Sequence, residues 1–163
     1  MTSSQIPPKY SVVIPTRNGG KYLRYAINSV LSCARNDVEI IVSNNHSTDD
    51  TSQLLASYAN ASITVVQPPE ALPMAAHYEF ALRQANGEWL TILGDDDAVL
   101  PYIFDALDNY IAADSSIQAI TSPRAYYFWD GCQDLYGDEY VYYSSSIFNL
   151  KLNSTLFLFL ALL

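Results

Sequence analysis

The chain has 163 residues and a formal net charge of −9, from 17 acidic and 8 basic residues. Half of the residues are hydrophobic and only 15% are charged, which excludes an intrinsically disordered protein and predicts one domain with a substantial core. An acidic chain without a cluster of lysine and arginine excludes nucleic acid as a partner. An anionic substrate would therefore need a cation or helix dipoles in order to bind.

The cysteines and the two ends of the chain give expectations about the compartment. Cys33 and Cys132 form neither a metal-ligand spacing nor a disulfide framework, which favours a reducing cytoplasm and leaves a single bridge open. Residues 1–9 lack the regions of a signal peptide and are expected to form a flexible leader. The apolar stretch 156–163 is too short to span a bilayer. It indicates either a truncated C-terminus or a tail that contacts a partner or a membrane surface.

Apolar, β-branched runs alternate with segments of helical spacing along most of the chain. The expected strands are 10–14, 38–42, 63–66, 88–93 and 117–121, and the expected helices are 21–32, 49–58, 73–85 and 101–112. Pro15 is expected to end the first strand. This alternation predicts an α/β domain over residues 10–121, with a mostly parallel sheet and helices on both faces.

The pattern changes after residue 122. Two aromatic runs, 126–129 and 139–143, surround Gly131 and Gly137 and predict an antiparallel β-hairpin. Residues 122–163 are therefore expected to form a C-terminal segment distinct from the alternating domain.

The most informative run is 89–97, in which an apolar segment of β type ends in Asp95, Asp96 and Asp97. Three adjacent carboxylates repel one another unless solvent, a helix N-terminus or a divalent cation compensates them. Hard oxygen ligands at the end of a strand suit Mg²⁺ or Mn²⁺ that holds a diphosphate. The alternative is a solvated acidic turn that caps the helix beginning near Pro101.

Two further polar clusters, 15–18 and 43–47, follow the first and second expected strands. Because ligands of open α/β sheets bind outside the carboxyl ends of the strands, the three clusters together predict a nucleotide or phosphate site. His46 is interpreted as a loop residue near that site. His77 is expected on the surface or at the packed edge of a helix.

Three segments in the order 10–32, 38–51 and 72–101 resemble the family 2 glycosyltransferases, which are inverting enzymes with a GT-A (Rossmann-like) fold. The resemblance implies metal-assisted transfer of a sugar from a nucleoside diphosphate sugar, with UDP the expected nucleotide. The implied acceptor is a carbohydrate or a lipid-linked molecule, as in polysaccharide biosynthesis. By the same resemblance, residues 122–163 are a partial acceptor-side segment, truncated at the C-terminus.

The resemblance also implies roles for residues in all three polar clusters. Asp97 would coordinate the metal of this DXD-type motif, although the register within the three aspartates is ambiguous. The nucleotide and the sugar would contact Pro15, Thr16, Arg17, Asn18, Asn44, Asn45, Ser47, Asp95 and Asp96.

Two roles remain open. Asn44 stands where the family commonly has an aspartate that contacts the base, and an amide donates as well as accepts, so the base preference is open. The catalytic base is unknown. None of the acidic residues after Asp114 lies in a recognisable base motif: Asp130, Asp134, Asp138 and Glu139.

Other interpretations compete with an active transferase. The chain could be a non-catalytic remnant that binds a nucleotide sugar. A nucleotidyltransferase would show a glycine-rich basic loop after the first strand, of which residues 17–21 are a faint version. A phosphoacceptor receiver domain is disfavoured because its acidic pair would follow the first strand. Arg124 and the aromatic run after it either bind an acceptor or pack as a hairpin.

Overall fold

The structure, a computed structural model, describes residues 7–121. The aromatic hairpin and the segment 122–163 that the sequence predicts lie outside these residues, as does most of the expected leader. Within the leader, the backbone of Lys9 hydrogen-bonds to Asp37 and to Trp89. The backbone just before the first strand is therefore tied to the sheet.

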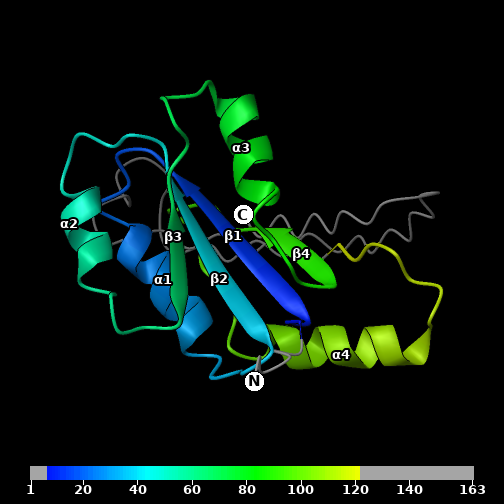
Figure 1. Ribbon diagram of the computed structural model, residues 1–163. Coiled ribbons are helices and arrows are strands. Elements are labelled where there is room, and N and C mark those ends of the chain that lie inside the picture. The colour runs from blue at the N-terminus through cyan, green and yellow to red at the C-terminus, as the bar shows by residue number, and fades with distance from the viewer. Residues whose placement is uncertain (1–6, 122–163) are drawn as a thin grey trace, which may run out of the picture.

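Four parallel strands form one sheet in the order β3-β2-β1-β4. Each strand is followed by a helix, so the predicted mostly parallel α/β architecture is confirmed (Figure 1). The strand order reverses between β1 and β4, which makes this pair the switch point of the sheet. The strands are β1 (Tyr10–Thr16), β2 (Val38–Asn44), β3 (Ile63–Val66) and β4 (Trp89–Ile92).

Strand β1 does not end at Pro15, as the sequence suggested, but continues through Thr16. The Val13 carbonyl accepts a hydrogen bond from the N–H of Leu93. The backbone polar groups of alternate β1 residues, Val13 and Pro15 among them, therefore point toward β4. Strand β4 ends at Ile92, which pairs with Val13. The missing N–H of Pro15 therefore lies where no ladder partner is needed, and β1 tolerates the proline.

The helices cover both faces of the sheet, as predicted. Side chains of α1, α2 and α4 pack in one apolar cluster with Val12, Ile14 and Val42, whereas α3 packs on the other face with Val13 and Ile41. The helices are α1 (Leu23–Leu31), α2 (Thr51–Ala56), α3 (Met74–Leu82) and α4 (Ile103–Ala113).

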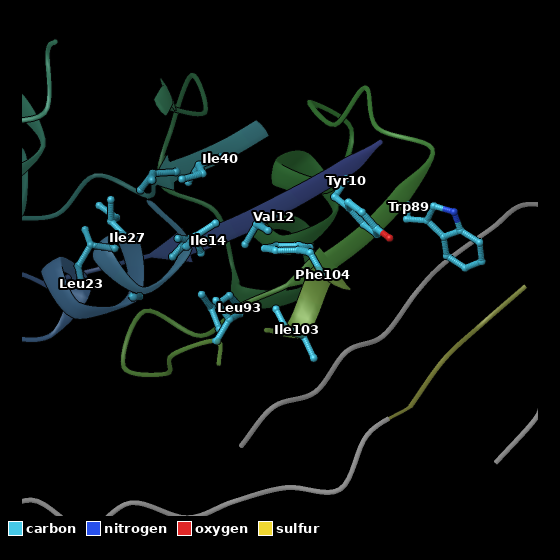
Figure 2. Packing of buried hydrophobic residues seen from close by; sticks show 14 of the residues in the cluster. Tyr10, Val12, Ile14, Leu23, Ile27, Ile40, Trp89, Leu93, Ile103 and Phe104 are labelled. Carbon is cyan, nitrogen blue, oxygen red and sulfur yellow. The ribbon is translucent and has the colours of Figure 1, made fainter. Parts of the chain in front are cut away.

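The larger cluster forms the main core. Figure 2 shows Val12 and Ile14 of β1 between the side chains of α1 and those of Ile103 and Phe104. All seven residues of β1 are buried, which explains why this strand reads as a nearly continuous apolar run. Burial of such side chains contributes about 25 cal/mol per Å² of apolar surface and is the main driving force for this fold.

The prediction of a strand over residues 117–121 is wrong, because these residues form neither helix nor strand. The N–H of Ile117 instead donates to the carbonyl of Asp114 in a turn. Ile117 and Ile120 pack against the main core. Their apolar pattern thus reflects packing of irregular chain and not a sheet ladder. Within residues 7–121, no helix is both long and apolar enough to cross a membrane.

Candidate functional site

The carboxyl ends of the four strands and the loops after them meet at one edge of the sheet (Figure 1). Thr16 at the end of β1 pairs in register with Asn44 at the end of β2. The backbone N–H of Asn45 then donates to the carbonyl of Thr16 at 2.9 Å. The predicted clusters 15–18 and 43–47 are therefore brought together by the sheet itself.

A side-chain hydrogen bond joins the third cluster to the first across the switch point. Thr16 Oγ1 donates to Asp95 Oδ2 at 2.5 Å. Burial raises the pKa of Asp95, and so does the charge of Asp96, while the Thr16 hydroxyl and the backbone N–H of Arg17 counteract part of the rise. The first carboxylate of the run is thus a partly desolvated group held by the Thr16 hydroxyl and by the backbone N–H groups of Arg17 and of Asp95 itself.

Gly19 stands directly against this contact. A Cβ at residue 19 would collide with both Thr16 Oγ1 and Asp95 Oδ2. The chain after β1 can approach the carboxylate only because residue 19 lacks a side chain. Gly19 was not singled out as a site residue, and the Asn18-Gly19-Gly20 turn was the signal available in the sequence.

The second and third carboxylates lie on a tight turn after β4. The N–H of Asp97 donates to the carbonyl of Gly94 at 3.1 Å, which turns the chain back on itself. Asp96 is exposed and Asp97 is half-buried. Burial raises the pKa of Tyr78 on α3, and the charges of all three aspartates raise it further. The phenol of Tyr78 therefore lies within the electrostatic reach of the whole run.

Three further predicted ligand residues, Asn18, Ser47 and Asn45, make bonds that join neighbouring loops. The backbone N–H of Asn18 donates to Ser47 Oγ at 2.9 Å, and Asn18 Oδ1 accepts from the N–H of Thr48 at 2.8 Å. Asn18 has a φ of 61°, a left-handed conformation that asparagine tolerates better than most residues. These bonds tie the loop after β1 to the loop after β2.

The third of these residues, Asn45, connects the loop after β2 to the loop after β3. Its amide donates to the carbonyl of Leu72 and accepts from the N–H of Leu72, each at 2.8 Å. His46 hydrogen-bonds through Nε2 to the carbonyl of Pro68 at 2.9 Å. The expectation that His46 is a loop residue at this edge is confirmed, and the segment 67–72 is held beside it.

Asn44 is buried with its amide in one orientation. Its Oδ1 accepts from the N–H of Ser47 at 3.0 Å, and its Nδ2 donates to Ser52 Oγ at 3.1 Å. These two partners fix which end of the amide carries the donor. Each end of the amide keeps the capacity for one further hydrogen bond.

The structure corrects the expected position of His77. It was expected on the surface or at the edge of a helix, but it is only 3% exposed and faces Ser43 of β2. The helical spacing that included His77 was correct. The sequence did not show which side of α3 faces the sheet, because α3 is apolar nearly all round.

The donor set at this edge fits a hard divalent cation. Mg²⁺ and Mn²⁺ are often held by one or two carboxylates together with water and substrate phosphates. Asp97 and the exposed Asp96 provide such oxygens, whereas Asp95 is engaged by Thr16. Residues 7–121 contain no cluster of three or more acidic, histidine or cysteine side chains arranged to hold a metal. A cation here would therefore depend on the phosphates of its ligand.

An apolar pocket lies away from this edge, between β4, β1 and α4. It is lined by aromatic and aliphatic side chains, including those of Trp89, Val99 and Phe104. It contains none of the residues of the three polar clusters, so it is not part of the candidate site.

Comparison with known proteins identifies the family. The sequence model of glycosyl transferase family 2 matches residues 11–155. The chain belongs to this family. An uncharacterized glycosyltransferase of Rickettsia typhi is 31% identical over 116 residues, which cover 67% of this chain and 36% of the relative. The chain thus spans about a third of the length of such relatives.

Solved structures of family members have the same fold. TarS of Staphylococcus aureus, a poly(ribitol-phosphate) β-N-acetylglucosaminyltransferase, was solved with UDP and with UDP-GlcNAc. Its UDP complex superimposes with a TM-score of 0.63 at 27% identity, over 70% of this chain and 35% of that one. A mannosyltransferase of Pyrobaculum calidifontis, solved with GDP-Man and Mn²⁺, has a TM-score of 0.61 at 22% identity, over 72% of this chain and 36% of that one. At this identity the second comparison establishes the fold alone.

Proposed function

We propose that this chain forms the donor-binding part of an inverting, metal-dependent glycosyltransferase. The sugar would come from a nucleoside diphosphate sugar, most simply a UDP-sugar, and would pass to a carbohydrate or lipid-linked acceptor. The observation that carries the proposal is the bond between Thr16 and Asp95, because it joins the end of β1 to the start of the acidic run. The UDP complexes of TarS, which has the same fold, support the choice of nucleotide.

The ligand contacts divide between two groups of residues. Pro15, Thr16, Arg17 and Asn44 would face the base and the ribose, and the amide of Asn44 retains a donor and an acceptor for this purpose. The exposed guanidinium of Arg17 would approach the diphosphate. Asn18, Asn45 and Ser47 would shape the pocket through the loop bonds that they form.

The carboxylates would serve the reacting end of the donor. Asp95 and Asp96 would accept hydrogen bonds from the ribose and the sugar, and Asp97 would hold Mg²⁺ or Mn²⁺. When bound, the cation supplies Lewis-acid stabilisation of the charge that develops on the departing diphosphate. Inversion also requires a base that deprotonates the acceptor hydroxyl. The candidates after Asp114 lie outside the described residues, and the base stays unassigned.

Calorimetry of the full chain with UDP and MnCl₂ tests the proposal. We expect binding that requires Mn²⁺, and we expect Asp97→Ala to weaken it at least about tenfold because the cation loses a ligand. Asp105→Asn is the matched control. It also removes one negative charge, but from a side chain on α4 that is 76% exposed and pairs with Arg35. This variant should bind UDP as the unmodified chain does.

Three outcomes would contradict parts of the proposal. A folded chain that binds no UDP with Mn²⁺ would refute the nucleotide assignment. Unchanged affinity for UDP with Mn²⁺ in Asp97→Ala would mean that a residue other than Asp97 holds the metal. UDP binding without hydrolysis or transfer of a UDP-sugar would favour the alternative that the chain binds a donor and does not catalyse.

A further inference from the structure

We propose that His77 is a positioning residue: through its buried hydrogen bond to Ser43 it fixes α3 against the end of β2 and so places Tyr78 beside the three aspartates. Ser43 Oγ and His77 Nε2 are 2.9 Å apart. Ser43 is 0% exposed and His77 is 3% exposed, so neither can exchange this bond for water. This inference rests on the proposed function, because it concerns how the same site is held.

The position of Ser43 on the sheet explains why this bond can act on the site. Side chains alternate along β2, so Ser43 lies on the same face as Ile41, which packs against α3. Ser43 pairs in register with Pro15, and Arg17 follows two residues later. The bond therefore anchors α3 at the carboxyl edge, directly beside the loops that carry the predicted ligand residues.

The bond fixes the adjacent residue of α3 as well. The rings of His77 and Tyr78 meet edge to face with their centroids 6.3 Å apart. Tyr78 is half-buried and lies within the electrostatic reach of all three aspartates. A rotation or shift of α3 would move this aromatic side chain relative to the carboxylates. Tyr78 would then no longer form a defined wall of the donor site.

The charges around His77 favour the neutral imidazole. Burial lowers the pKa of His77, and the positive charge of Arg17 lowers it further, whereas the contact with Ser43 opposes the shift in part. The charge of Arg17 acts on His77 from the loop after β1, Ser43 contacts it from β2, and Tyr78 lies next to it on α3. A proton on His77 would place a second positive charge beside Arg17 at the edge where the ligand binds.

The experiment compares four variants of the full chain by calorimetry with UDP and MnCl₂. We expect Ser43→Ala and His77→Leu each to weaken binding about tenfold, and the double variant to add little, because both remove the same bond. His77→Gln keeps a hydrogen-bonding group at this position and should restore most of the affinity at pH 7. As the pH falls through the lowered pKa of His77, the UDP affinity of the unmodified chain should decrease more than that of His77→Gln, since glutamine cannot take up a proton.

Ser11→Ala is the matched control. Ser11 is also a fully buried serine on the α3 side of the sheet, but it lies at the opposite end of β1, where it bonds to Glu39 and to Gly87. We expect a comparable loss of stability without a change in UDP affinity. If Ser11→Ala weakens UDP binding as much as Ser43→Ala does, the effect is general and the positioning role is refuted.

A readout without ligand separates this inference from the proposed function. In Ser43→Ala and His77→Leu, amide hydrogen exchange should become faster in α3 and in residues 44–47, and not in α1 or α4. Exchange that is unchanged at these amides, or UDP affinity unchanged in the folded variants, refutes the role of His77. A chain that binds no UDP at all refutes the proposed function, and the exchange data still decide the role of His77.

Discussion

Thr16 and Asp95 form the contact on which the candidate site most depends. The hydroxyl of Thr16 is buried, and its acceptor is a carboxylate that burial and Asp96 drive toward the protonated form. A hydrogen bond to a charged acceptor is worth about 1.5–3 kcal/mol in proteins. We therefore regard Thr16 as the residue that keeps Asp95 ionised and oriented at the switch point of the sheet.

We predict that Thr16→Val lowers the free energy of unfolding by about 2 kcal/mol at pH 7, because Asp95 loses a donor and valine has nearly the same shape as threonine. Asp95 has a raised pKa, so acid protonates it readily and the protonated carboxyl depends less on that donor. The loss measured by urea denaturation should therefore be smaller at pH 4 than at pH 7.

Thr51→Val is the control for this prediction. Thr51 is also buried, and its hydroxyl also donates to a carboxylate at 2.5 Å, but that carboxylate belongs to the exposed Asp49. Water can replace the lost donor there, so the destabilisation should be smaller. Equal losses of stability in Thr16→Val and Thr51→Val would mean that the partial burial of Asp95 does not make its hydrogen bond stronger than that of the exposed Asp49.

Residue type and position in the sequence predicted which side chains meet at the edge, but not what each one does there. The proximity of Thr16 and Asp95 could be predicted because they lie at or just after the carboxyl ends of two strands in one parallel sheet. Asn18, Asn45 and Ser47 could not be assigned in this way. Their amides and hydroxyls serve backbone groups of neighbouring loops, and those partners depend on loop conformations that short polar segments do not encode locally.

At the scale of elements, bonds between loops hold the carboxyl edge together. The loop after β2 is attached to the loop after β1 through Asn18 and to the loop after β3 through Asn45. None of these loops contains a ladder of its own, so a few side-chain bonds determine the shape of the edge. Loops fixed in this way can present ligand groups with little loss of entropy on binding.

We predict that Asn45→Ala destabilises the chain by about 1–3 kcal/mol, because it leaves the N–H and carbonyl of the half-buried Leu72 without their partner. Limited proteolysis should cut within residues 67–73 faster than in the unmodified chain. Asn86→Ala, an exposed asparagine of the loop before β4, should change stability by less than about 0.5 kcal/mol. A variant Asn45→Ala with unchanged stability and cleavage would show that this bond does not hold the loop.

Helix and strand identity could be predicted for eight elements because apolar spacing is strong where a segment packs on a core. The ends of the elements were harder. Pro15 suggested a strand end, but the effect of a missing N–H depends on which neighbour the residue faces. Ile117 and Ile120 had the composition of a strand, yet irregular chain buries apolar side chains equally well. Pairing is a long-range property, which short windows of sequence do not contain.

At the scale of the whole molecule, the two ends of the sheet differ in how their carboxylates are paired. At the amino end, the carboxylate of Asp108 accepts hydrogen bonds from Lys9 and Tyr10, and Arg35 bridges it to Asp37. At the carboxyl edge, the described residues include the three adjacent aspartates after β4 and, in the loop after β1, Arg17. Among the described residues, the carboxylates Asp108 and Asp37 are thus paired with cations at the amino end, whereas the carboxyl edge presents a run of three aspartates.

The lowered pKa values of Asp108 and His77 predict two steps in the dependence of the free energy of unfolding on pH. Burial alone would raise the pKa of Asp108, but hydrogen bonds from Lys9, Tyr10 and Arg35 outweigh it and lower the pKa to about 2. The stabilisation by Asp108 is therefore complete above its unfolded value of 3.8 and is lost as the pH falls toward 2. The pKa of His77 is also lowered, so its contribution is complete above 6.5 and declines at lower pH.

Urea denaturation between pH 2 and pH 8 should resolve these steps in difference curves against two variants. Relative to Asp108→Asn, the unmodified chain should be more stable by about 1 kcal/mol near pH 5, a value reduced for the one third of the side chain that is exposed, and the advantage should vanish by pH 2. Relative to His77→Gln, its stability should fall between pH 6.5 and pH 5. A constant difference across the whole range would contradict this account, because the loss of each group would then act through packing and not through its ionisation.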